Sequence, residues 1–401
     1  MEHLPQEFIC NILTRLSVKE LSKCKCVCKS WLDLITTPHF ITNHYLVYNN
    51  QQDHHLLVIR APFLTKPYIS LFSWDTSQPK GLVSSQIFNP PYEYNNGNIQ
   101  YWTRIMGPCN GIFCLIGYPN ALMNPSMRQF LLLPKSHHRD SPDEMNDFNE
   151  HYGFGFDPNT NDYKIVVLRD FVLDDSDEGE KNEFLPAELY SLNSNSWRDI
   201  GAPHYNPFPF NTWRSSSIYT FVKNCCHWWG FLVDEFGNKG DYVLAFDMVN
   251  ELFRKIKVPK VEYSLHDCSK TLVPFNEYET IGIILYPRGL DNWFHFDVWV
   301  MKDYFDEGSW ILQYSLGPVP VTYYLVGFYG SDRFVWRDDN ERLVLYEAAN
   351  DNTRHLPVNN TKYDSVRTAR YMESLVSLKR GNESSLRCFS CSFVPDTLQL
   401  N

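Results

Sequence analysis

The sequence predicts two parts of different fold class: a small α-helical module over residues 1–45 and an all-β region of propeller type over most of the remainder. Three observations support this α+β, two-domain division. Helical periodicity is sustained only in the first 45 residues. Beyond about residue 52, short runs rich in aromatic and β-branched residues alternate with turns of Asn, Asp, Gly and Pro. A strand–turn–strand pattern also recurs along this second part.

The helical module is predicted to contain three helices. The first follows Pro5, which suits an opening helical turn, and its apolar stripe has the spacing i, i+3, i+4, i+7: Ile9, Ile12, Leu13 and Leu16. Ser17 and Glu20 form a capping-box pattern that starts the second helix. The third carries a further stripe and ends before Pro38: Val27, Trp31, Leu34 and Ile35. So small a module leaves apolar surface that a partner usually covers.

The β region repeats a half-unit that consists of a strand, a polar turn, an aromatic residue and the end of a second strand. Its aromatic residues are spaced by 67, 56 and 57 positions: Phe130, Trp197, Phe253 and Trp310. A last copy, from Leu343 to Tyr346 and on to Pro357, lacks the aromatic residue. Such steps suit four-stranded propeller blades with loops of varying length, and we expect roughly six blades. A two-sheet sandwich is the alternative, although more than 300 residues is long for one. We place a linker at 46–52, the β domain at 53–380 and a C-terminal tail at 381–401.

The charge balance of the sequence indicates which classes of partner the protein can bind. Lys and Arg total 36 against 47 Asp and Glu, which gives a net charge of −11. The first 45 residues have a net charge of +1, so the rest of the chain carries about −12. A protein that binds nucleic acid by neutralising phosphates needs the opposite balance, so we expect no nucleic-acid partner. A basic protein is the favoured partner. With no signal-peptide pattern and no run of about 20 apolar residues, we expect a cytoplasmic chain without membrane contact and with reduced cysteines.

No pattern of catalytic or metal-binding residues stands out, so we expect neither enzyme activity nor a cofactor or metal. Cys24, Cys26 and Cys28 alternate without a matching second set, and are interpreted as small buried residues. Cys388 and Cys391 form a lone C-x-x-C.

An acidic run near residue 175 does not fit a calcium loop, because Leu185 falls where a bidentate Glu is needed. It is either a solvated loop or a surface that steers a basic target, with these candidate target-binding residues: Asp174, Asp175, Asp177 and Glu178. An aromatic mouth that binds a glycan or small molecule is a competing use of the β domain. Its candidate residues are otherwise core aromatics: Trp213, Trp228, Trp229 and Trp293.

The first 45 residues resemble an F-box. The motif lies in Leu4-Pro5, in Leu16 to Leu21, and above all in Cys26-Val27-Cys28-Lys29-Ser30-Trp31. The resemblance implies docking onto a Skp-type adaptor and, through it, onto the cullin and RING subunits of a ubiquitin ligase. By the same analogy the adaptor-binding residues are Leu4, Pro5, Ile9, Ile12, Leu13, Leu16, Val27 and Trp31. Any one of Ile12, Leu16 and Trp31 could instead belong to the core of the module.

The β region resembles the F-box-associated domain of plant F-box proteins, which is related to the kelch type. The motifs are Gly107 to Leu115 and Tyr152 to Pro158, although the Gly-Gly doublets of kelch blades are missing. Within this family the segments His227 to Gly230 and Val298 to Tyr304 resemble S-locus F-box proteins of pollen. That likeness implies a substrate receptor for S-RNase, a basic ribonuclease of self-incompatibility. A sibling receptor with a defence or housekeeping target is the alternative.

Overall fold

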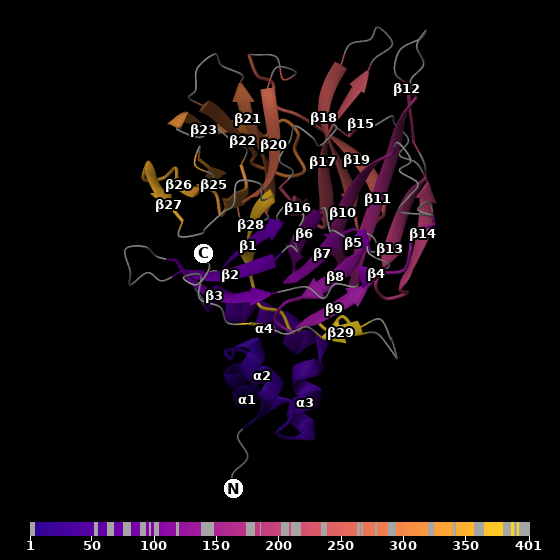
Figure 1. Ribbon diagram of the computed structural model, residues 1–401, viewed down its shortest axis with the longest axis vertical. Helices are drawn as coiled ribbons and strands as arrows, with labels where there is room; N and C mark the ends of the chain where they lie inside the picture. The colour runs from indigo at the N-terminus through magenta and orange to yellow at the C-terminus, as the bar shows by residue number, and fades with distance from the viewer. Residues whose placement is uncertain are drawn as a thin grey trace. The chain divides into compact units, whose positions relative to one another are not determined.

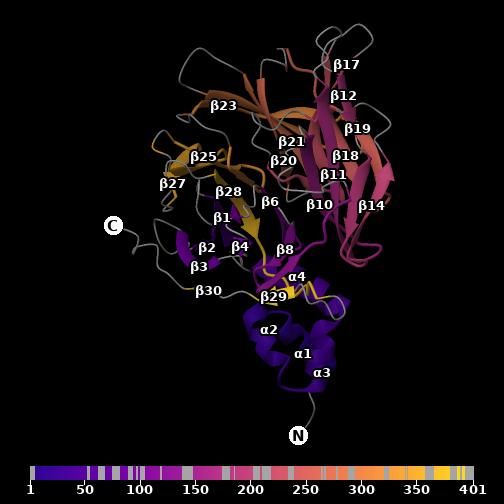
Figure 2. The same ribbon diagram turned by 45° about the vertical axis from the view of Figure 1, so that its right-hand side comes forward.

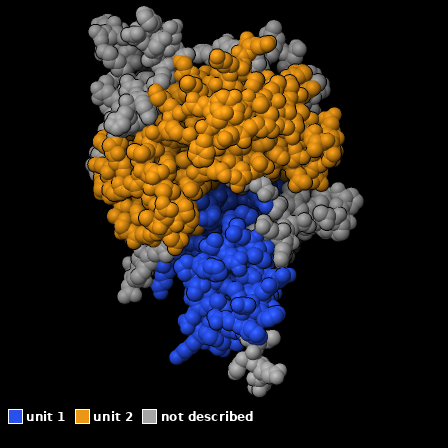
Figure 3. Space-filling view, turned by 180° about the vertical axis from the view of Figure 1, so that it is seen from behind, with its two compact units in different colours: residues 1–133, 363–401 blue, residues 134–362 orange. Residues whose placement is uncertain are grey.

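The computed structural model divides the chain into two compact units: residues 1–133 with 363–401, and residues 134–362 (Figure 3). It describes residues 5–392 apart from 52–54, 62–67, 75–81, 89–93, 96–97, 100–103, 118–119, 138–147, 174–180, 185, 202–207, 210–217, 234–238, 263–264, 266–267, 277–278, 288–293, 320–324, 339, 341, 357–364, 380–385 and 389–390.

The helices of the first unit are α1 (Gln6–Leu13), α2 (Val18–Cys24), α3 (Lys29–Thr36) and α4 (Pro38–Gln51). Both ribbon views show α1, α2 and α3 gathered into one bundle (Figures 1 and 2). The capping box predicted from the sequence is present, because the Ser17 side chain accepts from Glu20 N and the Glu20 carboxylate accepts from Ser17 N. Two backbone donors at the start of α2 are therefore satisfied by side chains.

The fourth helix corrects the prediction of three helices and of a linker at 46–52. Pro38, read as a stop signal, instead opens α4, where a proline needs no backbone donor. Phe40, His44 and Tyr48 follow at intervals of four, are buried, and stack in succession along the helix. Their spacing could have revealed this helix before the structure did.

Two five-stranded antiparallel sheets complete the first unit. One has the order β28-β1-β2-β3-β30: β28 (Ser365–Tyr371), β1 (His55–Ala61), β2 (Tyr68–Trp74), β3 (Leu82–Phe88) and β30 (Cys391–Ser392). The other has the order β29-β9-β8-β7-β6: β29 (Leu386–Cys388), β9 (Gln129–Leu132), β8 (Ala121–Asn124), β7 (Ile112–Ile116) and β6 (Arg104–Cys109). A small pair stands apart: β4 (Tyr94–Asn95) and β5 (Asn98–Ile99).

The second unit holds four sheets made of consecutive strands. The first contains β10 (Phe148–Asp157), β11 (Asp162–Leu173), β12 (Lys181–Phe184), β13 (Ala187–Ser191) and β14 (Ser196–Gly201). The second contains β15 (Phe208–Pro209), β16 (Phe221–Val222), β17 (Cys225–Val233), β18 (Lys239–Asp247) and β19 (Leu252–Lys257). The third contains β20 (Cys268–Phe275), β21 (Thr280–Pro287), β22 (Phe294–Met301) and β23 (Trp310–Val319). The fourth contains β24 (Gly327–Tyr329), β25 (Arg333–Arg337), β26 (Leu343–Glu347) and β27 (Asn352–His355).

The repeat read from the sequence is a hairpin in five sheets, and it lies at the sheet edge in four of them. Its aromatic residues face a large side chain across the hairpin in four of them, at the pairs Met123–Phe130, Tyr190–Trp197, Phe246–Phe253 and Met301–Trp310. Four of the five hairpins close through four residues whose last member has a positive φ: Arg128, Asn195, Glu251 and Asp351. The predicted strand pairs are therefore confirmed, and four of their turns end in a residue with a positive φ.

Neighbouring sheets pack through shared apolar cores. In the first unit, Phe113, Met123 and Tyr371 belong to the cluster between the two five-stranded sheets. In the second unit, Phe296, Phe334 and Trp336 are central to the cluster of the third and fourth sheets. This face-to-face burial of aromatic residues is the packing that the 15% aromatic content predicted.

The expectation of roughly six repeated blades was too simple. Four sheets use consecutive strands, whereas both sheets of the first unit take strands from the two ends of the chain. The segment predicted as a C-terminal tail supplies β29 and β30, which add backbone hydrogen bonds to the open edges of β9 and β3. Cys388 and Cys391 consequently lie on strands of different sheets.

A stretch after β28, residues 372–379, joins the helices to the sheets of the first unit; we call it the C-terminal brace. On one side, the Asn124 side chain donates to the carbonyls of Ser374, at 3.1 Å, and Val376, at 2.6 Å. Gly111, in the turn between β6 and β7 with a φ of +77°, makes this approach possible. A Cβ there would lie 2.5 Å from the Ser374 Cβ.

On its other side the brace enters the helical core. Val18 N, at the start of α2, donates to the Glu373 carboxylate at 2.8 Å. Leu375 is buried in the cluster formed by Leu13, Leu21 and Phe40 among others. The helical module is therefore completed by residues more than 330 positions away in sequence.

Replacing Leu375 with Ala should loosen the helices. A buried Leu-to-Ala change costs about 2–5 kcal/mol, and this one opens a cavity inside the helical core rather than within a sheet. We expect hydrogen exchange of the α1–α3 amides to accelerate while that of β20–β23 is unchanged. Equal exchange in the helices of both proteins would contradict the role given to the brace.

Candidate adaptor-binding surface

The helices of the first unit leave several large apolar side chains in water. Phe8 and Ile12, 61% and 55% exposed, lie one turn apart on α1, and Val27 and Leu32 lie just before and within α3. Pro5, at the start of α1, is exposed as well. Side chains of this kind on a small helical module are typical of a surface that a partner covers.

The structure divides the predicted adaptor-binding residues into three groups. Pro5, Ile12 and Val27 are exposed and available to a partner. Ile9, Leu16 and Trp31 are half-buried against the helical core. Leu13 is 2% exposed and belongs to that core, so its side chain is not presented on the surface of the module. Leu4 lies outside the described residues.

Two exposed apolar residues of α1 and α3 were missed by the sequence analysis, Phe8 and Leu32. The signal for Phe8 was present, because it precedes Ile12 by four positions and so shares its side of α1. The stripe was instead read as one face from Ile9 to Leu16. Neighbours such as Ile12 and Leu13 are separated by about 100° around a helix, so one of them can point outward.

The cysteines of the module correct another expectation. Cys24 is half-buried, as a small core residue would be, but Cys26 and Cys28 are exposed. They lie between α2 and α3, where the chain leaves the helical core. The Cys28 thiol is 3.2 Å from the Ser30 hydroxyl, and this hydrogen bond lowers the pKa of the thiol.

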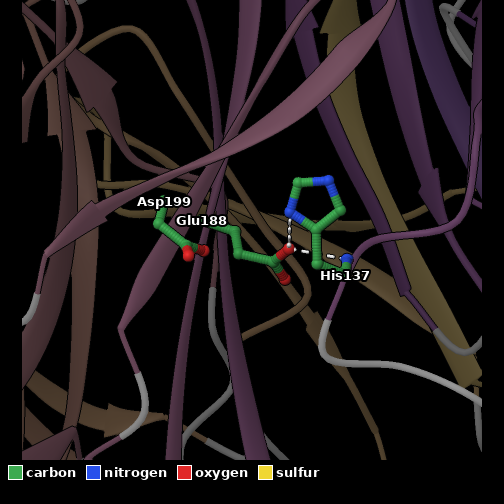
Figure 4. A group of neighbouring side chains, drawn as sticks. All are labelled: His137, Glu188 and Asp199. Atoms are coloured by element: carbon green, nitrogen blue, oxygen red, sulfur yellow. Dashed lines mark hydrogen bonds and ion pairs between the residues drawn. The ribbon is translucent and has the colours of Figure 1, made fainter.

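In the second unit, His137, Glu188 and Asp199 bring potential metal-ligand atoms within 4.8 Å of one another (Figure 4). Glu188 is already engaged, because its carboxylate accepts from His137 N at 2.7 Å and forms a buried ion pair with Arg169. Arg169 also bonds Glu150, at 3.0 Å. Burial disfavours the charged guanidinium, but these two carboxylates outweigh that effect and hold its pKa above the usual value. The group is explained as a structural charge network.

Of the four tryptophans considered for a glycan site, two lie in the core and two lie outside the described residues. Trp228 donates to the Tyr152 carbonyl at 3.1 Å and packs between sheets. Trp229 is buried, donates to Asp241 at 2.9 Å, and has the Lys270 ammonium 4.9 Å from its ring centre. Both have the core role that was the alternative interpretation. Trp213 and Trp293 lie outside the described residues, as do all four acidic target-binding candidates: Asp174, Asp175, Asp177 and Glu178.

A loop of the second unit, residues 302–309 between β22 and β23, is supported by a buried histidine. His227 Nε2 lies 2.7 Å from the hydroxyl of Tyr304, and His227 Nδ1 lies 3.3 Å from the Thr220 carbonyl. Burial lowers the pKa of His227 to about 3. A neutral imidazole therefore holds Tyr304 in place at physiological pH.

This histidine predicts a loss of stability in mild acid. In the unfolded chain its imidazole takes up a proton below about pH 6.5, whereas the folded protein resists protonation down to about pH 3. The free energy of unfolding should therefore decrease as pH falls from 6.5 toward 3. Thermal melting at pH 7, 6 and 5 should show a smaller loss in His227→Gln than in the unaltered protein. Equal losses in the two would contradict this assignment.

Comparison with known proteins agrees with both parts of the architecture. The family profile described as "F-box domain" matches residues 1–43, and the profile described as "F-box associated beta propeller domain" matches residues 64–400. The chain therefore belongs to the F-box proteins with an F-box-associated β-propeller domain. An F-box domain implies the role of substrate receptor in a Skp–cullin–F-box ubiquitin ligase.

Individual relatives come from Arabidopsis thaliana. The chain is 24% identical over 388 residues to the F-box/kelch-repeat protein At3g23880, covering 94% of this chain and 96% of the relative. It is 25% identical over 319 residues to the F-box protein CPR1, covering 77% and 72% of the two. Among solved structures, the Aleuria aurantia lectin has 8% sequence identity to this chain and a TM-score of 0.33. The match covers 80% of this chain and 96% of the lectin chain, and the similarity is too low to bear on ligands.

Among the described helices, none is long and apolar enough to span a bilayer.

Proposed function

We propose that this protein is the substrate receptor of a Skp–cullin–F-box ubiquitin ligase and brings a basic target protein to it for degradation. One observation carries the proposal: an F-box whose helices expose apolar side chains is joined in one chain to a propeller domain. The receptor acts by proximity. Holding the target beside the ubiquitin-charged enzyme raises the effective concentration of its lysines, so the receptor needs no covalent chemistry of its own.

The adaptor-binding surface that we propose consists of the exposed residues of α1 and α3 and their flanks: Pro5, Phe8, Ile12, Val27 and Leu32. Ile9, Leu16 and Trp31 support it from the core below. Apolar area removed from water contributes about 25 cal/mol per Å², so a few such side chains can anchor a stable complex.

The net charge of −11 supports a basic target, because opposite charges accelerate association. The more specific proposal is that this target is an S-RNase of the self-incompatibility response. It rests on the likeness of His227 to Gly230 and Val298 to Tyr304 to S-locus F-box proteins. A receptor with a defence or housekeeping target would share the adaptor but not this substrate.

Reconstitution tests both levels of the proposal. The full chain is assembled with a Skp-type adaptor, cullin and RING subunit, and ubiquitin transfer is followed with S-RNase and with lysozyme, a basic protein of unrelated origin. Assembly and preferential modification of S-RNase are expected. Assembly without preference would reject the ribonuclease and keep the ligase, and failure to bind the adaptor would reject the receptor role.

A further inference from the structure

Two apolar side chains of the second unit are more exposed than any other large hydrophobic residue in the described parts of the chain. Phe305 is 73% exposed and lies in the loop between β22 and β23, and Leu252 is 66% exposed at the start of β19. The position of Arg254 relates these two residues to one another. Arg254 follows Leu252 by two positions, on the same face of β19, and its guanidinium carbon lies 5.8 Å from the centre of the Phe305 ring.

The loop that carries Phe305 is held in shape by its own hydrogen bonds. Phe305 N donates to the Asp303 carboxylate at 2.9 Å, and Gly308 N donates to the Asp306 carboxylate at 2.8 Å. The hydroxyl of Ser309 bonds the carbonyls of Asp303 and Asp306. Beneath the loop, buried Tyr304 contacts His227 and Arg254. Phe305 is thus presented to water by a preordered loop, which reduces the entropy lost on binding.

The charges around Phe305 are unevenly compensated. Residues 302–309 contain three carboxylates and one cation, Lys302, which bonds Gln313. Glu307 has a neighbouring cation, since the Lys257 ammonium lies 3.8 Å away. Asp303 and Asp306, on either side of Phe305, are exposed and form no ion pair with any described residue. A further cation, Arg254, has its guanidinium carbon 5.8 Å from the centre of the Phe305 ring. The apolar tip is therefore flanked by two exposed carboxylates, with one guanidinium beside its ring.

We propose that Phe305 and Leu252, with Asp303 and Asp306, form a docking surface for the recruited protein. Its occupant is a basic segment that combines an apolar side chain with nearby Lys or Arg. The apolar side chain packs on Phe305 and Leu252, and the cations lie beside the two aspartates. This inference rests on the proposed receptor function and names the kind of target segment that the receptor holds.

A peptide library displayed on phage tests the surface, because it samples many combinations of apolar and charged side chains at once. It is panned against the full chain purified with its adaptor. We expect enrichment of peptides that place Lys or Arg within a few positions of an apolar residue. The strongest such peptide, synthesised with a fluorescent label, then gives affinities by polarisation.

Three variants separate the contributions. Leu252→Ser with Phe305→Ala removes the apolar contact and should weaken the peptide at least about tenfold. Asp303→Asn with Asp306→Asn removes both charges but keeps the oxygen acceptors of the loop, and should weaken binding mainly at low salt. Leu312→Ser, an exposed apolar residue on β23, is the matched control and should bind normally.

The outcomes decide the inference. Enrichment of acidic peptides, or equal affinity in the first variant and the Leu312 control, would overturn it. Adaptor binding by every variant is measured in parallel. If the unaltered chain does not bind the adaptor, the proposed receptor function is rejected. If adaptor binding is intact but the change at Leu252 and Phe305 leaves the peptide affinity unchanged, only this surface is rejected.

Discussion

Replacing Phe8 and Ile12 together with Glu should reduce the affinity for a Skp-type adaptor at least about a hundredfold. Both side chains are more than half exposed and neither belongs to the buried helical core. A carboxylate placed at the centre of an apolar interface must be desolvated without a partner when the complex forms. Titration calorimetry of the full chain against the adaptor measures the loss.

Leu46→Glu is the matched control, because Leu46 on α4 is 55% exposed, as is Ile12. It introduces one carboxylate on another helix of the same module and should bind the adaptor normally. Circular dichroism and melting temperature should be unchanged in both proteins. A double variant that still binds the adaptor tightly would remove α1 from the proposed surface.

Arg169→Ala should lower the free energy of unfolding by about 3–5 kcal/mol. Arg169 is almost fully buried and its ion-pair partner Glu188 is entirely buried, so the substitution leaves a carboxylate in the protein interior without its main partner. Denaturant unfolding followed by tryptophan fluorescence measures this loss of stability.

A paired replacement shows whether the uncompensated charge causes this loss. Arg169→Met combined with Glu188→Gln removes both charges and keeps similar volumes. It should recover at least half of the stability lost in Arg169→Ala. If the pair is as unstable as the single variant, the side-chain packing of Arg169, rather than the ion pair, is responsible.

Features that depend on neighbours in sequence were predictable. The capping box at Ser17, the three short helices and the hairpins at Phe130 and Trp197 depend on contacts within about ten residues. The pattern of side chains therefore contains the information that forms them. For the same reason the motif near the N-terminus correctly located the F-box domain, which the family profile matches at residues 1–43.

Features that depend on distant segments were not predictable. Nothing in the sequence near Val18 indicates that Glu373 will accept its backbone hydrogen bond, or that β29 will extend the sheet of β9. The pairing of Arg169 with Glu188 likewise needs the register of β11 and β13. Which apolar residues of α1 face outward also depended on the tertiary packing, since the stripe alone did not distinguish Ile12 from Leu13.

The C-terminal brace also affects when the protein becomes functional during its synthesis. Leu375 and Glu373 are translated more than 330 residues after α1–α3, yet they complete the core on which these helices pack. A nascent or prematurely terminated chain thus contains the F-box sequence without its finished core. We therefore expect the proposed adaptor-binding surface to be complete only after the propeller strands have been made, so that a truncated chain binds the adaptor less tightly than the full chain.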